Sequence, residues 1–276
     1  MISRVPSHAP GGAAPISRRN MTATLAALPV VALGLSALPS LAVTATELPD
    51  TSTSKTSQSR QEEPQSMHPK AFVYTELQIS VPFTDVPWND LNTAIAAQPG
   101  FIDKTWFSGL GNNSVGGLYS FASVEDALLY CTDFFPALAH DFGVAQTTRV
   151  FDNLATAEAS ADMDAPHFGG QVTTKPGAFV YTEVQVAVPF EKAPWRDRNP
   201  VLRKQKGLLS KIWLSGHNTD TLGGVDAFDT VDNALDFAIN DFPKTAAAMN
   251  AAFYTRVFDA RVTEDASRGL KSPYYL

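Results

Sequence analysis

The chain has 276 residues, of which 44% are hydrophobic and 18% are charged, as is usual for a globular protein. Its formal net charge is −7 and no basic stripe runs along it, so nucleic acid is not an expected partner. Cys131 is the single cysteine, which excludes a disulfide within the chain.

The N-terminus has the pattern of an export signal. Residues 17–21 read SRRNM, which resembles a twin-arginine motif, and an apolar run follows over residues 25–43. Small residues before Ala42 and Ala45 suit cleavage. We expect residues 1–45 to be a twin-arginine-type signal peptide and the mature protein to be periplasmic or extracellular. An uncleaved membrane anchor is the alternative, because the run is about long enough to cross a bilayer.

The remainder of the chain contains an internal duplication. FVYTEL at Phe72 returns as FVYTEV at Phe179, and at this offset of 107 there are 34 identities over 81 aligned positions. The polar composition before the first copy predicts a disordered linker. We expect a linker over 46–69, repeats over 70–153 and 178–260, a loose connection over 154–177, and a tail over 261–276 that ends in exposed tyrosines.

Each repeat reads as a small α+β unit. In the first, alternating β-rich residues predict a strand over 72–81, and Val73 and Tyr74 should face opposite sides of it. A short helix follows Pro87, and Ser123 is a suitable N-cap for a second helix that Pro136 should break. The remaining strands are expected over residues 101–108, 115–121 and 146–152. The order βαββαβ is that of a ferredoxin-like unit, and the second copy follows it.

Several short motifs resemble the YdhR-type mono-oxygenases of the dimeric α/β-barrel superfamily, which are related to the antibiotic-biosynthesis mono-oxygenases. These motifs are Pro99-Gly100-Phe101, Lys104-x-Trp106, the GGLY run over 116–119, and Val150-Phe151-Asp152. The resemblance implies two ferredoxin-like units packed sheet to sheet, with helices outside and an apolar cavity in each unit. Both units would lie in one chain here, as a pseudo-dimer that needs no second copy.

The resemblance also implies candidate functions. Several relatives oxidise phenol- or quinol-like molecules with dioxygen and without a cofactor, so we expect a cofactor-independent mono-oxygenase with a small aromatic or apolar ligand. A non-catalytic binding or stress-related module is the alternative, and a haem-binding protein is a third. The cofactor-independent relatives use a pocket Asn, Trp and Arg. Asn92 and Asn199 correspond between the repeats, but the sequence assigns neither of them a catalytic role.

Polar and aromatic residues within the strands are the candidates for a pocket. An aromatic wall beside a cavity suits a planar ligand, although such residues also serve as plain core. Acids on a buried sheet face need partners, so we expect Glu76, Lys104 and Arg149 to interact, and likewise their counterparts Glu183, Lys211 and Arg256. These sets form either a structural network or a floor where Arg149 and Arg256 stabilise a phenolate. The pocket candidates are Trp106, Trp213, Tyr74, Tyr181, Glu76, Glu183, Lys104 and Lys211.

The histidines do not suggest a metal site. His140 and His217 are the only two within the repeats, and they do not correspond to each other. His217 is a candidate acid/base at a pocket mouth, and the alternative is a haem ligand. The repeats differ most in their first helix, which carries a cationic set in the second repeat. This set either forms a solvated face or attracts an anionic ligand. This set is Arg196, Arg198, Arg203, Lys204 and Lys206.

Overall fold

The computed structural model describes residues 68–186, 188–219 and 221–275. The expected signal over 1–45 and most of the linker over 46–69 lie outside this part, so the signal and export stay predictions. Within the described ranges, no helix is both long enough and apolar enough to cross a bilayer.

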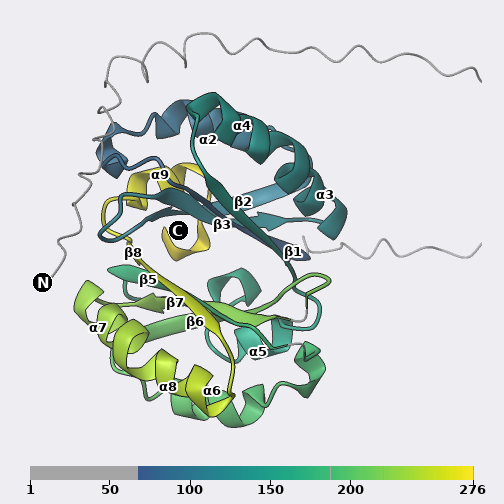
Figure 1. The fold of residues 1–276 in the computed structure, drawn as a ribbon, viewed down its shortest axis with the longest axis vertical. Coiled ribbons are helices and arrows are strands. Elements are labelled where there is room, and N and C mark those ends of the chain that lie inside the picture. The colour runs from purple at the N-terminus through teal and green to yellow at the C-terminus, as the bar shows by residue number, and fades with distance from the viewer. Residues whose placement is uncertain (1–67, 187, 220, 276) are drawn as a thin grey trace, which may run out of the picture. The chain divides into compact units, whose positions relative to one another are not determined.

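Two four-stranded antiparallel sheets form the centre of the molecule (Figure 1). The first has the order β2-β3-β1-β4 and the second has the order β6-β7-β5-β8, so the predicted βαββαβ topology is confirmed in both repeats. The strands of the first sheet are β1 (Ala71–Leu77), β2 (Phe101–Ser108), β3 (Val115–Phe121) and β4 (Gln146–Asp152). Those of the second are β5 (Ala178–Val184), β6 (Leu208–Ser215), β7 (Leu222–Phe228) and β8 (Phe253–Asp259).

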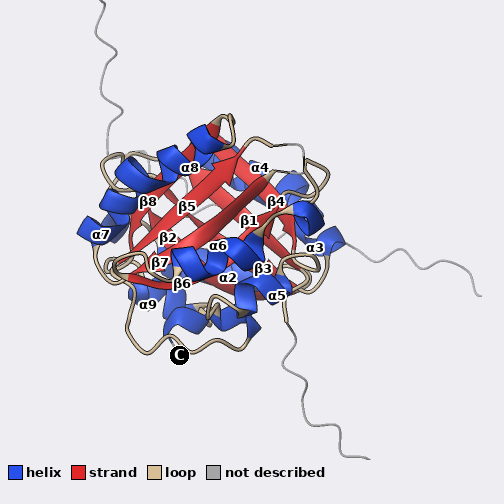
Figure 2. Cartoon of the chain, turned by 90° about the horizontal axis from the view of Figure 1, so that it is seen from below, coloured by secondary structure: helices blue, strands red, loops and turns tan. Residues whose placement is uncertain are grey.

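Helices cover the outer faces of the two sheets (Figures 1 and 2). Those of the first repeat are η2 (Phe83–Asp85), α2 (Trp88–Ala96), α3 (Val124–Leu129), the π-helical η3 (Tyr130–Phe134) and α4 (Phe135–Phe142). Those of the second are η5 (Phe190–Lys192), α6 (Trp195–Leu202), α7 (Val231–Asp236), the π-helical η6 (Phe237–Asp241) and α8 (Phe242–Ala248).

The prediction that Pro136 breaks the second helix is wrong. The chain stays helical from α3 through η3 into α4. Proline lacks a backbone N–H, and the wider π turn before it accommodates the loss. There Phe135 N–H donates to the carbonyl of Tyr130, five residues back.

An aromatic core joins the inner faces of the sheets. Tyr74 and Tyr181 stack with their ring centroids 4.0 Å apart, and Phe107 and Phe258 stack at 4.6 Å. Val73 packs on the opposite face of β1, under the helices, so the predicted alternation is confirmed. The ends of the sheets meet through isolated β-bridges, Gly109 with Phe258 and Phe151 with Gly216.

Each repeat sends a final arm onto the other one. The helix α5 (Ala157–Ala161) packs on β6 and is followed by η4 (Pro166–Phe168), whereas α9 (Glu264–Gly269) packs on β2 and is followed by η7 (Pro273–Tyr275). In Figure 1 the yellow α9 accordingly lies against the sheet of the first repeat. The offset of 107 thus continues into both arms, where Ser160 corresponds to Ser267.

The arms occupy segments that the sequence predicts to be loose. The residues between the repeats contain α5 and η4, and Tyr274 and Tyr275 at the C-terminal end are buried against the inter-sheet core instead of exposed. Periodicity does not indicate the burial of these tyrosines, because the terminal aromatic stretch is too short to show a pattern.

We expect Ser160→Ala to lower the free energy of unfolding by about 1–3 kcal/mol, because it leaves a partly buried backbone N–H of the edge strand β6 without its acceptor. Ser160 Oγ accepts from the backbone N–H of Trp213 at 2.9 Å. Ser267 Oγ does the same for Trp106, also at 2.9 Å, so Ser267→Ala should cost a similar amount in urea denaturation. A loss from only one of the two variants would contradict the equivalence of the arms.

Candidate functional site

The predicted pocket residues lie on two opposite faces of the sheets. Trp106 and Trp213 pack in the cores beneath the helices, with Lys104 beside Trp106 and Lys211 beside Trp213. The tyrosine and glutamate candidates instead face the space between the sheets. A single pocket per repeat cannot contain both groups.

The expected ion pairs within each repeat are wrong. Arg256 Nη2 lies 2.6 Å from Glu76 Oε1, and Arg149 Nε lies 3.4 Å from Glu183 Oε2, so each acid is paired with an arginine of the other repeat. Neither Lys104 nor Lys211 joins these pairs, because their side chains point to the other face. Alternation along a strand fixes the face of a residue, but it does not indicate which sheet lies opposite.

Hydrogen bonds complete the environment of the two buried acids. Tyr74 Oη donates to Glu76 at 2.7 Å, and Tyr181 Oη donates to Glu183 at 2.6 Å. Burial alone would raise the pKa of Glu76, but hydrogen bonds from Ser114 and Tyr74 and the charge of Arg256 bring it below its usual value. The carboxylate of Glu76 is therefore a fixed anion of the core.

A cavity of about 210 Å³ lies between the outer face of the second sheet and the helices α6, η6 and α8. Its walls are largely apolar, with Trp213 on the sheet side and Phe237 and Phe242 on the helix side. Small-molecule pockets commonly measure about 300–1,000 Å³. The cavity is smaller than that range, so it admits only a small ligand.

The arm of the first repeat holds Trp213 in place through Asn199. Trp213 Nε1 donates to Asn199 Oδ1 at 2.8 Å, while Asn199 Nδ2 donates to the Ala159 carbonyl at 3.1 Å and to Asp162 at 2.7 Å. Asn199 is fully buried. All its hydrogen-bonding groups and the indole N–H are used, so both residues shape the cavity and neither offers a free donor to a ligand.

Two cations line the cavity. Arg198 Nη2 donates to Thr245 Oγ1 at 3.2 Å, and no acidic side chain of the described residues forms an ion pair with it. Lys211 Nζ donates to the buried Asp226 at 2.8 Å and lies 4.7 Å from the centre of the Trp213 ring. Burial raises the pKa of Asp226 although Lys211 opposes the shift. Arg198 is therefore the polar group best placed to meet a ligand.

The corresponding positions of the first repeat are filled with apolar side chains. Leu91 stands where the second repeat has Arg198, and Leu138 stands where it has Thr245. Both pack in the core beneath the helices, together with Ile95. Asn92 accepts from Trp106 Nε1 at 2.8 Å, so this repeat keeps the asparagine–tryptophan pair but lacks the arginine. The two repeats are thus chemically unequal.

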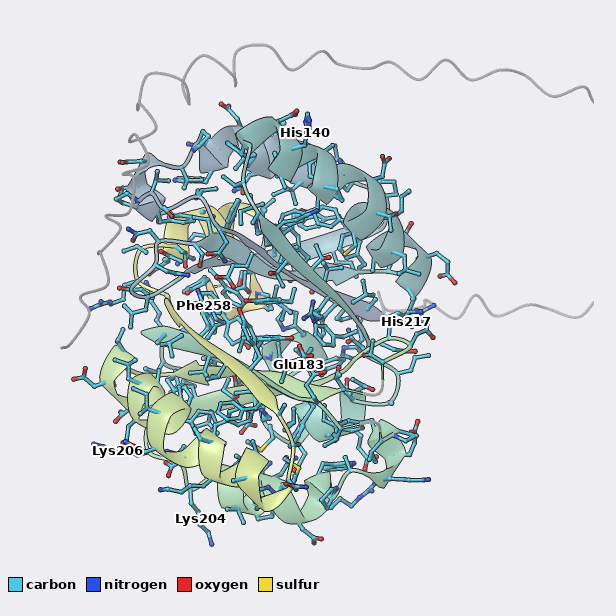
Figure 3. All side chains as sticks on the ribbon, viewed as in Figure 1. His140, Glu183, Lys204, Lys206, His217 and Phe258 are labelled. Carbon is cyan, nitrogen blue, oxygen red and sulfur yellow. The ribbon has the colours of Figure 1, made fainter. Side chains whose placement is uncertain are left out.

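The predicted cationic set is mostly a solvated face. Arg196 pairs with Glu158 at 3.0 Å, and Arg203 pairs with Asp162 at 3.0 Å. Lys204 and Lys206 lie at the periphery of the molecule (Figure 3). Arg198 is the member of this set that reaches the cavity.

The histidine candidates lie away from the cavity. His140 is on the outer surface of α4, and His217 is at the rim between the sheets (Figure 3). The cavity lining has no histidine or cysteine, so a haem there would lack the axial ligands of those types. The described residues contain no cluster of three or more His, Cys, Asp or Glu side chains suited to a metal. Independence from metals and cofactors stays a prediction.

The fold is that of a tandem ferredoxin-like α+β protein. Residues 77–162 match the family model described as "Putative mono-oxygenase ydhR", which confirms the resemblance for the first repeat and extends it through α5. No curated protein matches significantly.

Solved structures of similar topology include two from Listeria and one described as an anthrone oxidase-like protein. The monooxygenase-like protein from Listeria innocua is 10% identical over 71% of this chain and 98% of its own, with a TM-score of 0.39. The anthrone oxidase-like protein is 16% identical over 69% and 91%, with a TM-score of 0.42. A ferredoxin-fold protein from Listeria monocytogenes, described as related to antibiotic biosynthesis monooxygenases, is 11% identical over 71% and 98%, with a TM-score of 0.38.

Proposed function

We propose that the chain is a cofactor-independent mono-oxygenase that oxidises a small phenol or quinol with dioxygen in the cavity of the second repeat. The observation that carries this proposal is the arrangement of Asn199, Trp213 and Arg198, in which a clamped indole and a cation line one apolar cavity. This arrangement contains an Asn, a Trp and an Arg, the residue types that the resemblance implies for cofactor-independent relatives. The family match of the first repeat supports the same class.

The cations suit a substrate that reacts as an anion. The lining residues include Arg198 and Lys211 but no carboxylate and no histidine that would act as a base. A phenol acidic enough to ionise on binding would place its oxygen beside the Arg198 guanidinium, which stabilises the phenolate. The apolar walls would exclude water and strengthen this interaction.

The proposed reaction balances without another redox partner. The phenolate gives electrons to dioxygen, and a C–O bond forms at the ring carbon para to the hydroxyl. One oxygen atom stays there as a carbonyl. The ring C–H hydrogen and the phenolic hydrogen leave with the second oxygen atom as water, so a phenol and dioxygen yield a quinone and water. The protein contributes binding, orientation and stabilisation of charge.

We expect Arg198→Leu to lower kcat/KM for such a substrate about 10- to 100-fold, because the substitution removes the group that stabilises the phenolate. Oxygen uptake by the purified full-length chain would be measured across a panel of phenols and quinols. Arg196→Leu is the matched control, because it removes the same charge from the same helix but outside the cavity. Its effect should be within about twofold.

Two outcomes would count against the proposal. Absence of oxygen uptake with every substrate, together with saturable binding of the same molecules, would favour the binding-module alternative. Equal losses from Arg198→Leu and Arg196→Leu would show that the cations act only through the overall field of the helix.

A further inference from the structure

Two lysines correspond between the repeats, but their neighbours differ. Lys211 Nζ lies 2.8 Å from Asp226 Oδ1, so this buried ammonium group has a counterion. In the first repeat Tyr119 stands in the place of Asp226. Lys104 Nζ accordingly has no hydrogen-bond partner among the described residues, and burial lowers the pKa of Lys104 well below its usual value. Of the two, Lys211 is therefore the lysine whose ammonium form the fold supports.

Lys211 is also the one that lines the cavity of the second repeat. Its Nζ lies 4.7 Å from the centre of the Trp213 ring, which forms the wall on the sheet side. One ammonium hydrogen is used on Asp226, and within the described part of the chain no second acceptor forms a hydrogen bond with Lys211. Asp226 does not belong to the lining, so the cation of this pair is nearer the cavity than the anion.

The two cations of the cavity come from opposite walls. Arg198 belongs to α6 on the helix side, and Lys211 belongs to β6 on the sheet side. Oxidation of a phenolate by dioxygen involves two anions, because the negative charge moves from the phenolate oxygen to the reduced dioxygen. Arg198 is the proposed partner of the first anion, which leaves Lys211 as the lining cation available for the second.

Building on the oxidation proposed above, we propose that Lys211 is a catalytic residue that stabilises dioxygen as it is reduced. The phenolate transfers one electron to dioxygen, which leaves a phenoxyl radical and superoxide as a pair. An N–H of Lys211 that Asp226 does not use donates to the superoxide, and the positive charge stabilises this anion between apolar walls.

The remaining steps need no other reactant. The radical and the superoxide combine at the ring carbon para to the oxygen, which forms the C–O bond of a peroxide anion. The O–O bond then breaks as the hydrogen of that carbon is lost, and the products are the quinone and hydroxide. Hydroxide takes up the proton released when the phenol ionised, which gives water.

The double variant Lys211→Met with Asp226→Leu tests this role, because it removes the ion pair and leaves the net charge unchanged. Oxygen uptake at varied dioxygen gives kcat/KM for dioxygen. The phenol is the one that the wild type oxidises fastest, with 2-methoxyphenol as first choice because its para position is free. Anaerobic calorimetric titration gives the Kd of the same phenol. We expect kcat/KM for dioxygen to fall about 10- to 100-fold, while Kd stays within about twofold.

Two further variants control for the fold and for the position. Lys211→Gln with Asp226→Asn is also neutral but can keep a hydrogen bond between the two side chains, so it should show the same loss without a change in packing. Lys104→Met makes the same substitution as Lys211→Met at the corresponding position outside the cavity. Its kcat/KM for dioxygen should stay within about twofold of the wild type.

The possible failures are distinguishable. An unchanged kcat/KM for dioxygen in both double variants would overturn the role of Lys211 and leave the oxidation intact. Parallel losses of dioxygen reactivity and phenol binding would also overturn it, because they would show that Lys211 only maintains the shape of the cavity. Absence of oxygen uptake by the wild type with every phenol would instead refute the oxidation, and this inference with it.

Discussion

Asp226→Leu is expected to lower the free energy of unfolding by about 3–5 kcal/mol, because it leaves the ammonium group of Lys211 buried without its counterion. Lys211 Nζ and Asp226 Oδ1 are 2.8 Å apart, and their side chains are 5% and 0% exposed. A buried charge without a partner loses its hydration, and no Coulomb attraction offsets that loss of free energy. Urea denaturation at neutral pH would measure the loss.

The double variant Lys211→Met with Asp226→Leu is the control. It replaces the whole pair by apolar side chains of similar size, so most of the lost stability should return. If the double variant were as unstable as Asp226→Leu alone, the loss would come from packing around Asp226 and not from the unpaired charge.

Lys104→Met should change the stability in the opposite direction to Asp226→Leu. We expect it to raise the free energy of unfolding by about 1–3 kcal/mol. Lys104 corresponds to Lys211, but Tyr119 stands where the second repeat has Asp226. The amine nitrogen of Lys104 lies 2.7 Å from the centre of the Trp106 ring, is fully buried, and has no hydrogen-bond partner among the described residues. Methionine keeps the length of the side chain and removes the unsatisfied group.

The stabilisation should depend on pH in a defined direction. Burial lowers the pKa of Lys104 well below its ordinary value of 10.5, so between these two values the unfolded chain binds a proton that the folded chain does not. The wild type therefore gains stability as the pH rises through that window, and the advantage of Lys104→Met should shrink. An advantage that stays constant from neutral pH to pH 10.5 would contradict a neutral buried amine.

The strands and their faces were predictable from the sequence because they follow from local alternation. Val73 and Tyr74 lie on opposite faces as predicted, and the N-cap Ser123 accepts from the Asp126 backbone N–H at 3.0 Å. These features need only the chemistry of neighbouring residues.

The contacts between the repeats were not predictable in the same way. The pairing of Glu76 with Arg256 depends on which sheet lies opposite, and no pattern within one strand contains that information. The arms share few residues, among them Ser160 and Ser267, and α5 has five residues, too few to show a helical period. The sequence alone does not show that Arg198 lines a cavity, because a charged residue on an amphipathic helix usually faces water.

The exchange of α5 and α9 makes each half of the molecule rely on the other to hold its outer-face tryptophan, and in the second half that tryptophan lines the cavity. Between two separate chains such a site would be lost on dilution, because its formation would follow the equilibrium of association. The covalent connection over residues 170–177 keeps the halves at a high effective concentration, so site completion no longer depends on the amount of protein. Because both halves lie in one chain, their sequences can differ, whereas the two subunits of a homodimer are identical. One half can then keep Leu91 as a packing residue while the other carries Arg198 in a cavity, a division of labour that a symmetric dimer cannot have.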